Sequence, residues 1–145
     1  MNGSGKDDLH YNTVYLRGIS PAAAGTDDTA FVSQIIDTKD YKAVEFILML
    51  GSLADANATF VALLEEGDVS NLSDATAVAD ADMYGTEAAA GFTFAADNTT
   101  KKIGYHGYKR YCRLTITPSG NTGDVYLACV VAAIPVTQLP DPSTV

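Results

Sequence analysis

Residues 101–117 read KKIGYHGYKRYCRLTIT, a stretch that combines a strand pattern with a concentration of positive charge. It holds five of the nine Lys and Arg residues and three of the eight Tyr residues of the chain. From Lys109 to Thr117 apolar and polar residues alternate, which is typical of a half-buried strand. We therefore predict two consecutive strands, 102–105 and 109–117, joined by a tight bend at Gly107.

The next segment predicts a strand that pairs with the second of these two. Residues 118–123 (PSGNTG) are a strong turn signal, and residues 124–133 (DVYLACVVAA) alternate again. Folding symmetrically about the turn places Cys112 opposite Cys129 and Leu114 opposite Leu127. One face of the hairpin is then wholly apolar, while the other carries Tyr111, Arg113, Thr115, Tyr126, Ala128 and Val130. The apolar face consists of Cys112, Leu114, Ile116, Val125, Leu127, Cys129 and Val131.

The two cysteines in this hairpin have two interpretations. Two cysteines in 145 residues do not make a disulfide scaffold. Free cysteine is commonly buried as a small apolar residue, so a reduced core pair is the favoured interpretation. A redox bridge between Cys112 and Cys129 is the alternative.

Working outward, further short alternating or apolar runs predict more strands. The most apolar run is 44–50, whose length and flanking turns favour a buried strand. The run 59–66 also suits a helix, but the neighbouring pattern favours a strand. Residues 68–91 predict little regular structure beyond a helical turn near 77–83. The remaining predicted strands are 10–17, 29–36 and 91–95, the last with Phe92 and Phe94 on one face.

These patterns predict an all-β fold, an antiparallel β-sandwich of about eight strands. The long connections 18–28 and 68–91 favour a jelly-roll-like course over a simple meander. At 145 residues the chain fits one domain with a sizeable core. We predict a sandwich domain over 10–135, with an extended N-terminal arm (1–9) and an extended Pro-rich C-terminal tail (136–145).

The net charge argues against some kinds of partner, and the charged residues separate into an acidic and a basic region along the chain. The net charge of −9 argues against a nucleic-acid partner. No apolar run is long enough to span a membrane, and the N-terminal residues show no secretory signal, so we expect a soluble protein made in the cytosol. Ten acidic residues and no Lys or Arg lie between Lys42 and Lys101, whereas five basic residues and no acid lie between Asp97 and Asp124. Acidic and basic regions of this kind can pair within one subunit or between copies, the alternative being solvated faces of chance composition.

The basic and aromatic residues of the opening stretch are the best candidates for contacts with a partner, with the tyrosines as anchors. They are Lys101, Lys102, Tyr105, His106, Tyr108, Lys109, Arg110, Tyr111 and Arg113. In the N-terminal part of the chain the contact candidates are Lys6, Leu9 and Tyr11.

Catalytic and metal-binding patterns are weak. Four acids in the loop region (Asp74, Asp80, Asp82 and Glu87) match no EF-hand spacing, so solvated loop acids are the favoured interpretation over a Ca²⁺ site. His10 and His106 have no further ligand at zinc spacing. No Gly-x-Ser-x-Gly elbow is present, and no pair of carboxylates can be nominated for a glycan hydrolase. We expect no enzymatic activity, no metal and no cofactor.

A longer run resembles a known group of proteins. Residues 103–117 (IGYHGYKRYCRLTIT), followed by a Gly/Thr turn and a strand ending AAIP at 132–135, resemble small virion proteins of tailed bacteriophages. In that group a similar Ile-Gly-Tyr-x-Gly-x-Lys-Arg-Tyr segment follows an acidic stretch, to which LEEGD (64–68) and ADADMYG (79–85) are similar here. The resemblance covers roughly residues 28–135, and the N-terminal arm departs from it.

The resemblance carries functional implications. Proteins of this group are encoded among head genes, and several look like capsid decoration (cement) proteins with β-sandwich, often jelly-roll, folds. It implies a structural protein on the outer surface of the phage head that binds the major capsid protein and self-associates, with a homotrimer favoured over a dimer. The alternative is a carbohydrate- or receptor-binding sandwich of a phage fibre or tail.

Overall fold

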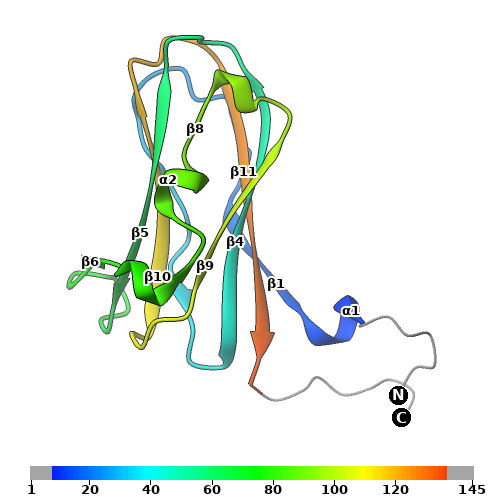
Figure 1. Ribbon diagram of the computed structural model, residues 1–145, viewed down its shortest axis with the longest axis vertical. Coiled ribbons are helices and arrows are strands. Elements are labelled where there is room, and N and C mark those ends of the chain that lie inside the picture. Colours follow the sequence, from blue (N-terminus) through cyan, green and yellow to red (C-terminus); the bar gives the residue numbers. More distant parts are fainter. Residues whose placement is uncertain (1–7, 137–145) are drawn as a thin grey trace.

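The computed structural model describes residues 8–136, which form two antiparallel sheets packed face to face (Figure 1). The predicted all-β sandwich is confirmed. Sheet A contains β1 (Val14–Ile19), β4 (Tyr41–Leu53), β7 (Met83–Tyr84), β9 (Thr100–Tyr105) and β11 (Val125–Pro135). Sheet B contains β2 (Phe31–Val32), β3 (Ile36–Asp37), β5 (Thr59–Gly67), β6 (Thr76–Ala77), β8 (Phe92–Thr93) and β10 (Tyr111–Ser119). The short helices are α1 (Leu9–Asn12), η1 (Asp80–Asp82), α2 (Glu87–Ala90) and η2 (Phe94–Ala96).

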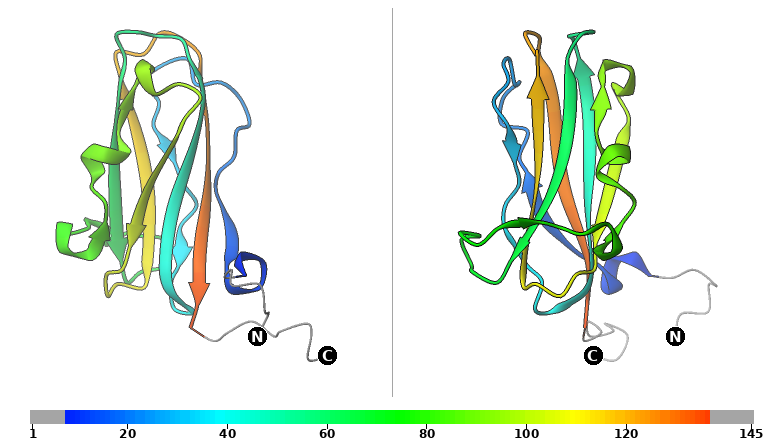
Figure 2. Two further views of the ribbon diagram at one scale, coloured as in Figure 1. Left: turned by 45° about the vertical axis from the view of Figure 1, so that its right-hand side comes forward. Right: turned by 60° about the vertical axis from the view of Figure 1, so that its left-hand side comes forward.

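The strand order follows the jelly-roll course that the long connections predicted. Sheet A has the order β1-β11-β4-β9-β7, and sheet B has β2-β10-β5-β6 with β3 beside β10 and β8 beside β5. We count β2 and β3 as one interrupted strand and leave out the two-residue strands β7 and β8. Successive strands along the chain then lie in opposite sheets, except that β5 and β6 lie in the same sheet. That alternation is the double Greek key of a jelly roll. Figure 2 shows the long strands of both sheets running along the long axis.

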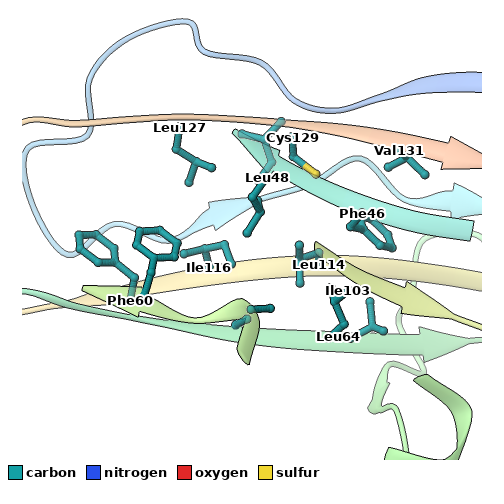
Figure 3. Close-up of a cluster of buried hydrophobic side chains, with 14 of the residues drawn as sticks. Phe46, Leu48, Phe60, Leu64, Ile103, Leu114, Ile116, Leu127, Cys129 and Val131 are labelled. Carbon is teal, nitrogen blue, oxygen red and sulfur yellow. The ribbon is translucent and has the colours of Figure 1, made fainter. Parts of the chain in front are cut away.

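The core lies between the sheets and is filled by alternate residues of the four long strands. Phe46 and Leu48 of sheet A and Leu64, Leu114 and Ile116 of sheet B are fully buried. Figure 3 shows these side chains pointing toward one another from the two sheets. The apolar run at 44–50 is therefore the inner part of a longer strand, β4, that alternates between the core and the outer face.

The predicted hairpin of the last two strands is wrong about which strands pair, but the prediction of which residues face the core is confirmed. β10 pairs with β5, so that Cys112 lies opposite Glu66, and β11 pairs with β4, so that Cys129 lies opposite Leu48. The turn between them crosses from sheet B to sheet A. All seven residues predicted to face inward are nevertheless buried, because the inner faces of both sheets border the same core.

Both cysteines are free thiols, buried on strands of opposite sheets. Burial raises the pKa of the Cys112 thiol and of the Cys129 thiol to about 12 each. A thiol with so high a pKa holds almost no thiolate at neutral pH and so reacts poorly. The structure thus agrees with the interpretation of two reduced core residues and shows no bridge.

Three local predictions need correction. Residues 10–17 are not one strand, because the Asp8 carboxylate accepts hydrogen bonds from the amides of His10 and Tyr11 and caps α1, so that β1 begins only at Val14. The strand predicted at 29–36 is interrupted at Ser33. The Ser33 hydroxyl accepts a hydrogen bond from the Leu114 amide and donates one to the Gln34 carbonyl. Phe92 and Phe94 do not share a face, since η2 begins at Phe94 and turns it outward.

Residues 1–7 and 137–145 lie outside the described residues, and with them the predicted contact residue Lys6 and nearly all of the Pro-rich tail. Within 8–136, every helix is too short to cross a membrane.

Candidate functional site: the β9–β10 loop and its surroundings

The loop from Tyr105 to Arg110 connects sheet A to sheet B at one end of the sandwich (Figure 1). Backbone hydrogen bonds hold it to two neighbouring turns. The His106 amide donates to the Asp82 carbonyl at 2.9 Å, and the Thr38 amide donates to the Arg110 carbonyl at 2.8 Å. The contact residues predicted between 105 and 110 therefore sit on a held loop.

Tyr105 anchors this loop from inside. Its side chain is only 2% exposed, and its hydroxyl lies 2.6 Å from Glu66 Oε2 and accepts a hydrogen bond from the Lys109 amide at 3.0 Å. Burial, followed by the Glu66 carboxylate, raises the Tyr105 pKa far above its ordinary value. A Cβ at Gly107 would lie 2.7 Å from both oxygens, so the bend requires glycine there. Tyr105 is therefore a structural residue and is not available to a partner.

Three of the predicted basic contact residues are paired within the subunit. Lys109 Nζ lies 2.6 Å from Asp68, Arg110 forms a two-pronged pair with Asp37 at 2.8 and 3.0 Å, and Arg113 lies 3.1 Å from Glu65. The Lys109–Asp68 and Arg113–Glu65 pairs join the acidic and basic regions within one subunit, whereas Asp37 lies outside the acidic region.

Lys101 and Lys102 differ from the other three. They lie on β9 of sheet A, whereas Arg110 and Arg113 adjoin or occupy β10 of sheet B. Among residues 8–136 neither lysine forms a salt bridge, and Lys102 is exposed. The stretch that looked like one basic surface is thus divided between two sheets.

Exposed aromatic side chains are concentrated beside the loop. Tyr108 is 97% exposed, and His106 packs against Tyr84 with ring centroids 4.2 Å apart. Tyr84 was missed as a contact candidate, although it stands in the ADADMYG segment that entered the resemblance. Tyr84 lies close to His106 because β7 pairs with β9, and the sequence around Tyr84 does not predict that pairing. Tyr111 is half-buried beneath the Arg110 guanidinium, 5.1 Å from its ring centre.

The two N-terminal candidates that the structure describes lie elsewhere. Leu9 and Tyr11 are exposed on α1, which precedes β1. β1 and β7 form opposite edges of sheet A, so these residues do not join the His106–Tyr84 cluster.

The four loop acids that were considered as Ca²⁺ ligands do not form a common site. Asp74 accepts hydrogen bonds from the amides of Asp68 and Val69, and Glu87 accepts one from the Leu64 amide in β5. In the part of the chain that the structure describes, no three His, Cys, Asp or Glu side chains are placed to hold a metal ion.

The ion pairs of the loop predict acid sensitivity. The Arg110 guanidinium lowers the pKa of Asp37, and the Lys109 ammonium lowers that of Asp68, both from an ordinary value of 3.8. Because the unfolded chain binds these protons more readily, stability from these pairs is present above pH 3.8 and falls as the pH drops through the lowered pKa values. We expect the melting temperature of the protein to fall between about pH 5 and pH 2.

A double substitution tests this assignment. The melting temperature of the K109M/R110M variant, measured by circular dichroism, should decrease less over the same acid range than that of the unmodified protein. The matched control is K101M, whose lysine forms no such pair. If all three proteins show the same acid dependence, the two pairs are not its source.

No known protein family matches the chain, and no curated protein matches it. Solved structures do. The PBSX exported protein XepA matches with a TM-score of 0.52 and 14% identity, over 94% of this chain but only 41% of XepA. The SPBc2 prophage-derived protein YomS matches with a TM-score of 0.42 and 10% identity, over 83% of this chain and 93% of YomS. The enzymatically active domain of bacteriophage CBA120 tailspike protein 4 matches with a TM-score of 0.44 and 15% identity, over 92% of this chain and 21% of that one.

At this level of identity the likeness to XepA shows a shared fold, and this chain spans about two fifths of the length of XepA.

Proposed function

We propose that this protein is a structural protein of a phage virion, a decoration protein that binds the outer surface of the head and clamps neighbouring major capsid subunits. The observation that carries the proposal is the β9–β10 loop. The segment whose sequence resembles small phage head proteins is also the one that presents Tyr108 and the His106–Tyr84 pair to solvent. The fold shared with the PBSX exported protein XepA is compatible with this proposal.

The loop suits contact with a large protein surface. Its backbone is held by the Tyr105–Glu66 bond and by the turns at Thr38 and Asp82, so little conformational freedom is lost when a partner binds. Tyrosine supplies a large contact area with few rotatable bonds, and it is enriched at the energetic centres of interfaces. Self-association of the protein would then join several such loops, and multivalency would turn weak single contacts into tight binding. This role requires no catalysis.

Co-sedimentation tests the proposal. Purified protein is mixed with heads assembled from the major capsid protein of the same phage, and bound copies per head are measured. We expect saturable binding, and the H106A/Y108S variant should bind at least about 30-fold more weakly, as for other centrally placed aromatic contacts. Charge reversal at Lys109 or Arg110 is a poorer probe, because it also breaks an internal ion pair.

The matched control is V61T, an exposed position on the outer face of β5, which should bind like the unmodified protein. Unmodified protein that stays in the supernatant at every head concentration would refute the proposal. Equal loss of binding in the H106A/Y108S and V61T variants would refute the role of the loop.

A second candidate function is recognition of a glycan or receptor. Tyr84 lines an open groove with Glu45, Ile47 and Lys102, and an exposed tyrosine beside charged side chains is an arrangement that can bind a sugar. Glycan-array binding that disappears in a Y84A variant, without binding to heads, would favour this function over capsid decoration.

A further inference from the structure

The outer face of sheet A is unusually apolar. Strand alternation turns one set of side chains of β1, β4 and β11 away from the core, and these are between 41% and 64% exposed. They are Tyr15, Met49, Tyr126, Val130 and Ile134. No described helix or loop covers them.

The strand register makes these residues neighbours. Val130 lies between Arg17 of β1 and Ile47 of β4, and Ala128 lies opposite Met49. Side chains opposite one another on a sheet face lie about 5 Å apart, so the apolar residues form one continuous surface.

The outer face of sheet B has a different character. There, Arg113 pairs with Glu65, and the neighbouring outward residues of β10 are Thr115 and Thr117. Threonine and charged pairs are what a solvated sheet face ordinarily carries. Sheet B also exposes Val32, Val61 and Leu63, but the outward residues of its central strand β10 from Arg113 to Ser119 are polar. The outward residues of β11 in sheet A are all apolar, so only sheet A carries an unbroken apolar row along a central strand.

The size of the face matches a stable protein–protein contact. The 11 residues of β11 span about 37 Å, and the four strands β1, β11, β4 and β9 span about 19 Å. Because β1 and β9 have only six residues each, two such faces in contact would bury roughly 1,200 Å², at the lower end of standard interfaces.

Charge points to a second copy of the same chain as the occupant. The face carries Arg17, Glu45 and Lys102, two cations and one carboxylate, whereas the whole chain has a net charge of −9. Two acidic copies can therefore approach through this face without strong repulsion, and both signs are present for pairing across the contact. A patch that meets its own copy generates a twofold dimer. We infer that two copies of this chain pack face to face through the outer face of sheet A.

The trimer implied by the sequence resemblance differs from this inference. A ring of three needs two different complementary patches on each subunit, whereas one self-complementary face makes a closed pair.

Mass measurement in solution tests the inference without phage heads, so its outcome is independent of the proposed capsid role. Light scattering after size exclusion should give about twice the chain mass of 15.2 kDa. M49D places a carboxylate on the face in both copies, opposite Ala128 and Thr100, where the contact would bury it with no cation directly opposite. We expect its dimer dissociation constant to rise by on the order of 100-fold or more.

V61D is the matched control, because Val61 is exposed on the outer face of sheet B, and it should remain dimeric. Circular dichroism checks that both variants keep the sandwich, and M49K gives a second test should M49D not fold. A monomeric or trimeric unmodified protein overturns the inference. So does an M49D or M49K variant that folds and remains dimeric.

Discussion

Replacing Leu64 by alanine should lower the free energy of unfolding by about 2–5 kcal/mol. Leu64 is fully buried in β5, opposite Leu114 of β10, and sits between the two sheets (Figure 3). The substitution removes buried methyl groups and leaves a cavity that the surrounding sheets can fill only in part. Urea unfolding followed by circular dichroism measures the loss.

The neighbouring residue supplies the control. Leu63 undergoes the same chemical deletion in the same strand, but its side chain points to the outer face and is 37% exposed. The L63A variant should lose about 1 kcal/mol or less, because less apolar area leaves water at this position. Equal losses at the two positions would contradict the register of β5, since a slip of one residue exchanges the two faces.

The second large effect is expected at Tyr105. The Y105F variant keeps the ring in the core and removes only the hydroxyl that joins Glu66 to the Lys109 amide. The Glu66 carboxylate and the Lys109 amide then lose a partner in a half-buried place, which costs about 1–3 kcal/mol of unfolding free energy. Urea unfolding at neutral pH measures this change.

Tyr108 is the control for the same deletion on the same loop. Its side chain is almost fully exposed, so Y108F should change the free energy of unfolding by no more than about 0.5 kcal/mol. If Y105F is no less stable than Y108F, the hydroxyl of Tyr105 does not hold the loop. The pair of variants also separates the structural tyrosine from the one available to a partner.

The β9–β10 stretch shows which structural features a sequence pattern can predict and which it cannot. Alternation correctly predicted that Cys112, Leu114 and Ile116 face the core, because a period of two residues is a local property of the strand. The same alternation predicted a hairpin with Leu127 opposite Leu114, which is wrong. Both arrangements bury the same residues, so burial alone cannot distinguish a strand's partner in one sheet from a neighbour in the opposite sheet.

The candidate contact residues show the same limit. Tyr105 and Tyr108 are three residues apart in one basic, aromatic run, and nothing local distinguishes them. The Glu66 carboxylate, 39 positions earlier, makes Tyr105 an internal anchor. Asp37 and Asp68 likewise engage Arg110 and Lys109, and long-range pairing brings Tyr84 to His106.

Local sequence patterns were enough to predict the fold class, the long strands and the seven inward residues of β10 and β11. These follow from alternation, turn residues and hydrophobicity, which act over a few neighbouring positions. The folded structure was needed to show which strands share a sheet, which charges are paired inside the subunit, and which apolar face no described helix or loop covers. Those outcomes depend on contacts between residues far apart in the chain, where several pairings bury nearly the same surface. The stretch at 101–117 therefore comprises a strand of sheet A between β4 and β7, an anchored loop, and a central strand of sheet B. The loop is exposed to a partner, and the uncovered apolar face lies on the outer side of sheet A.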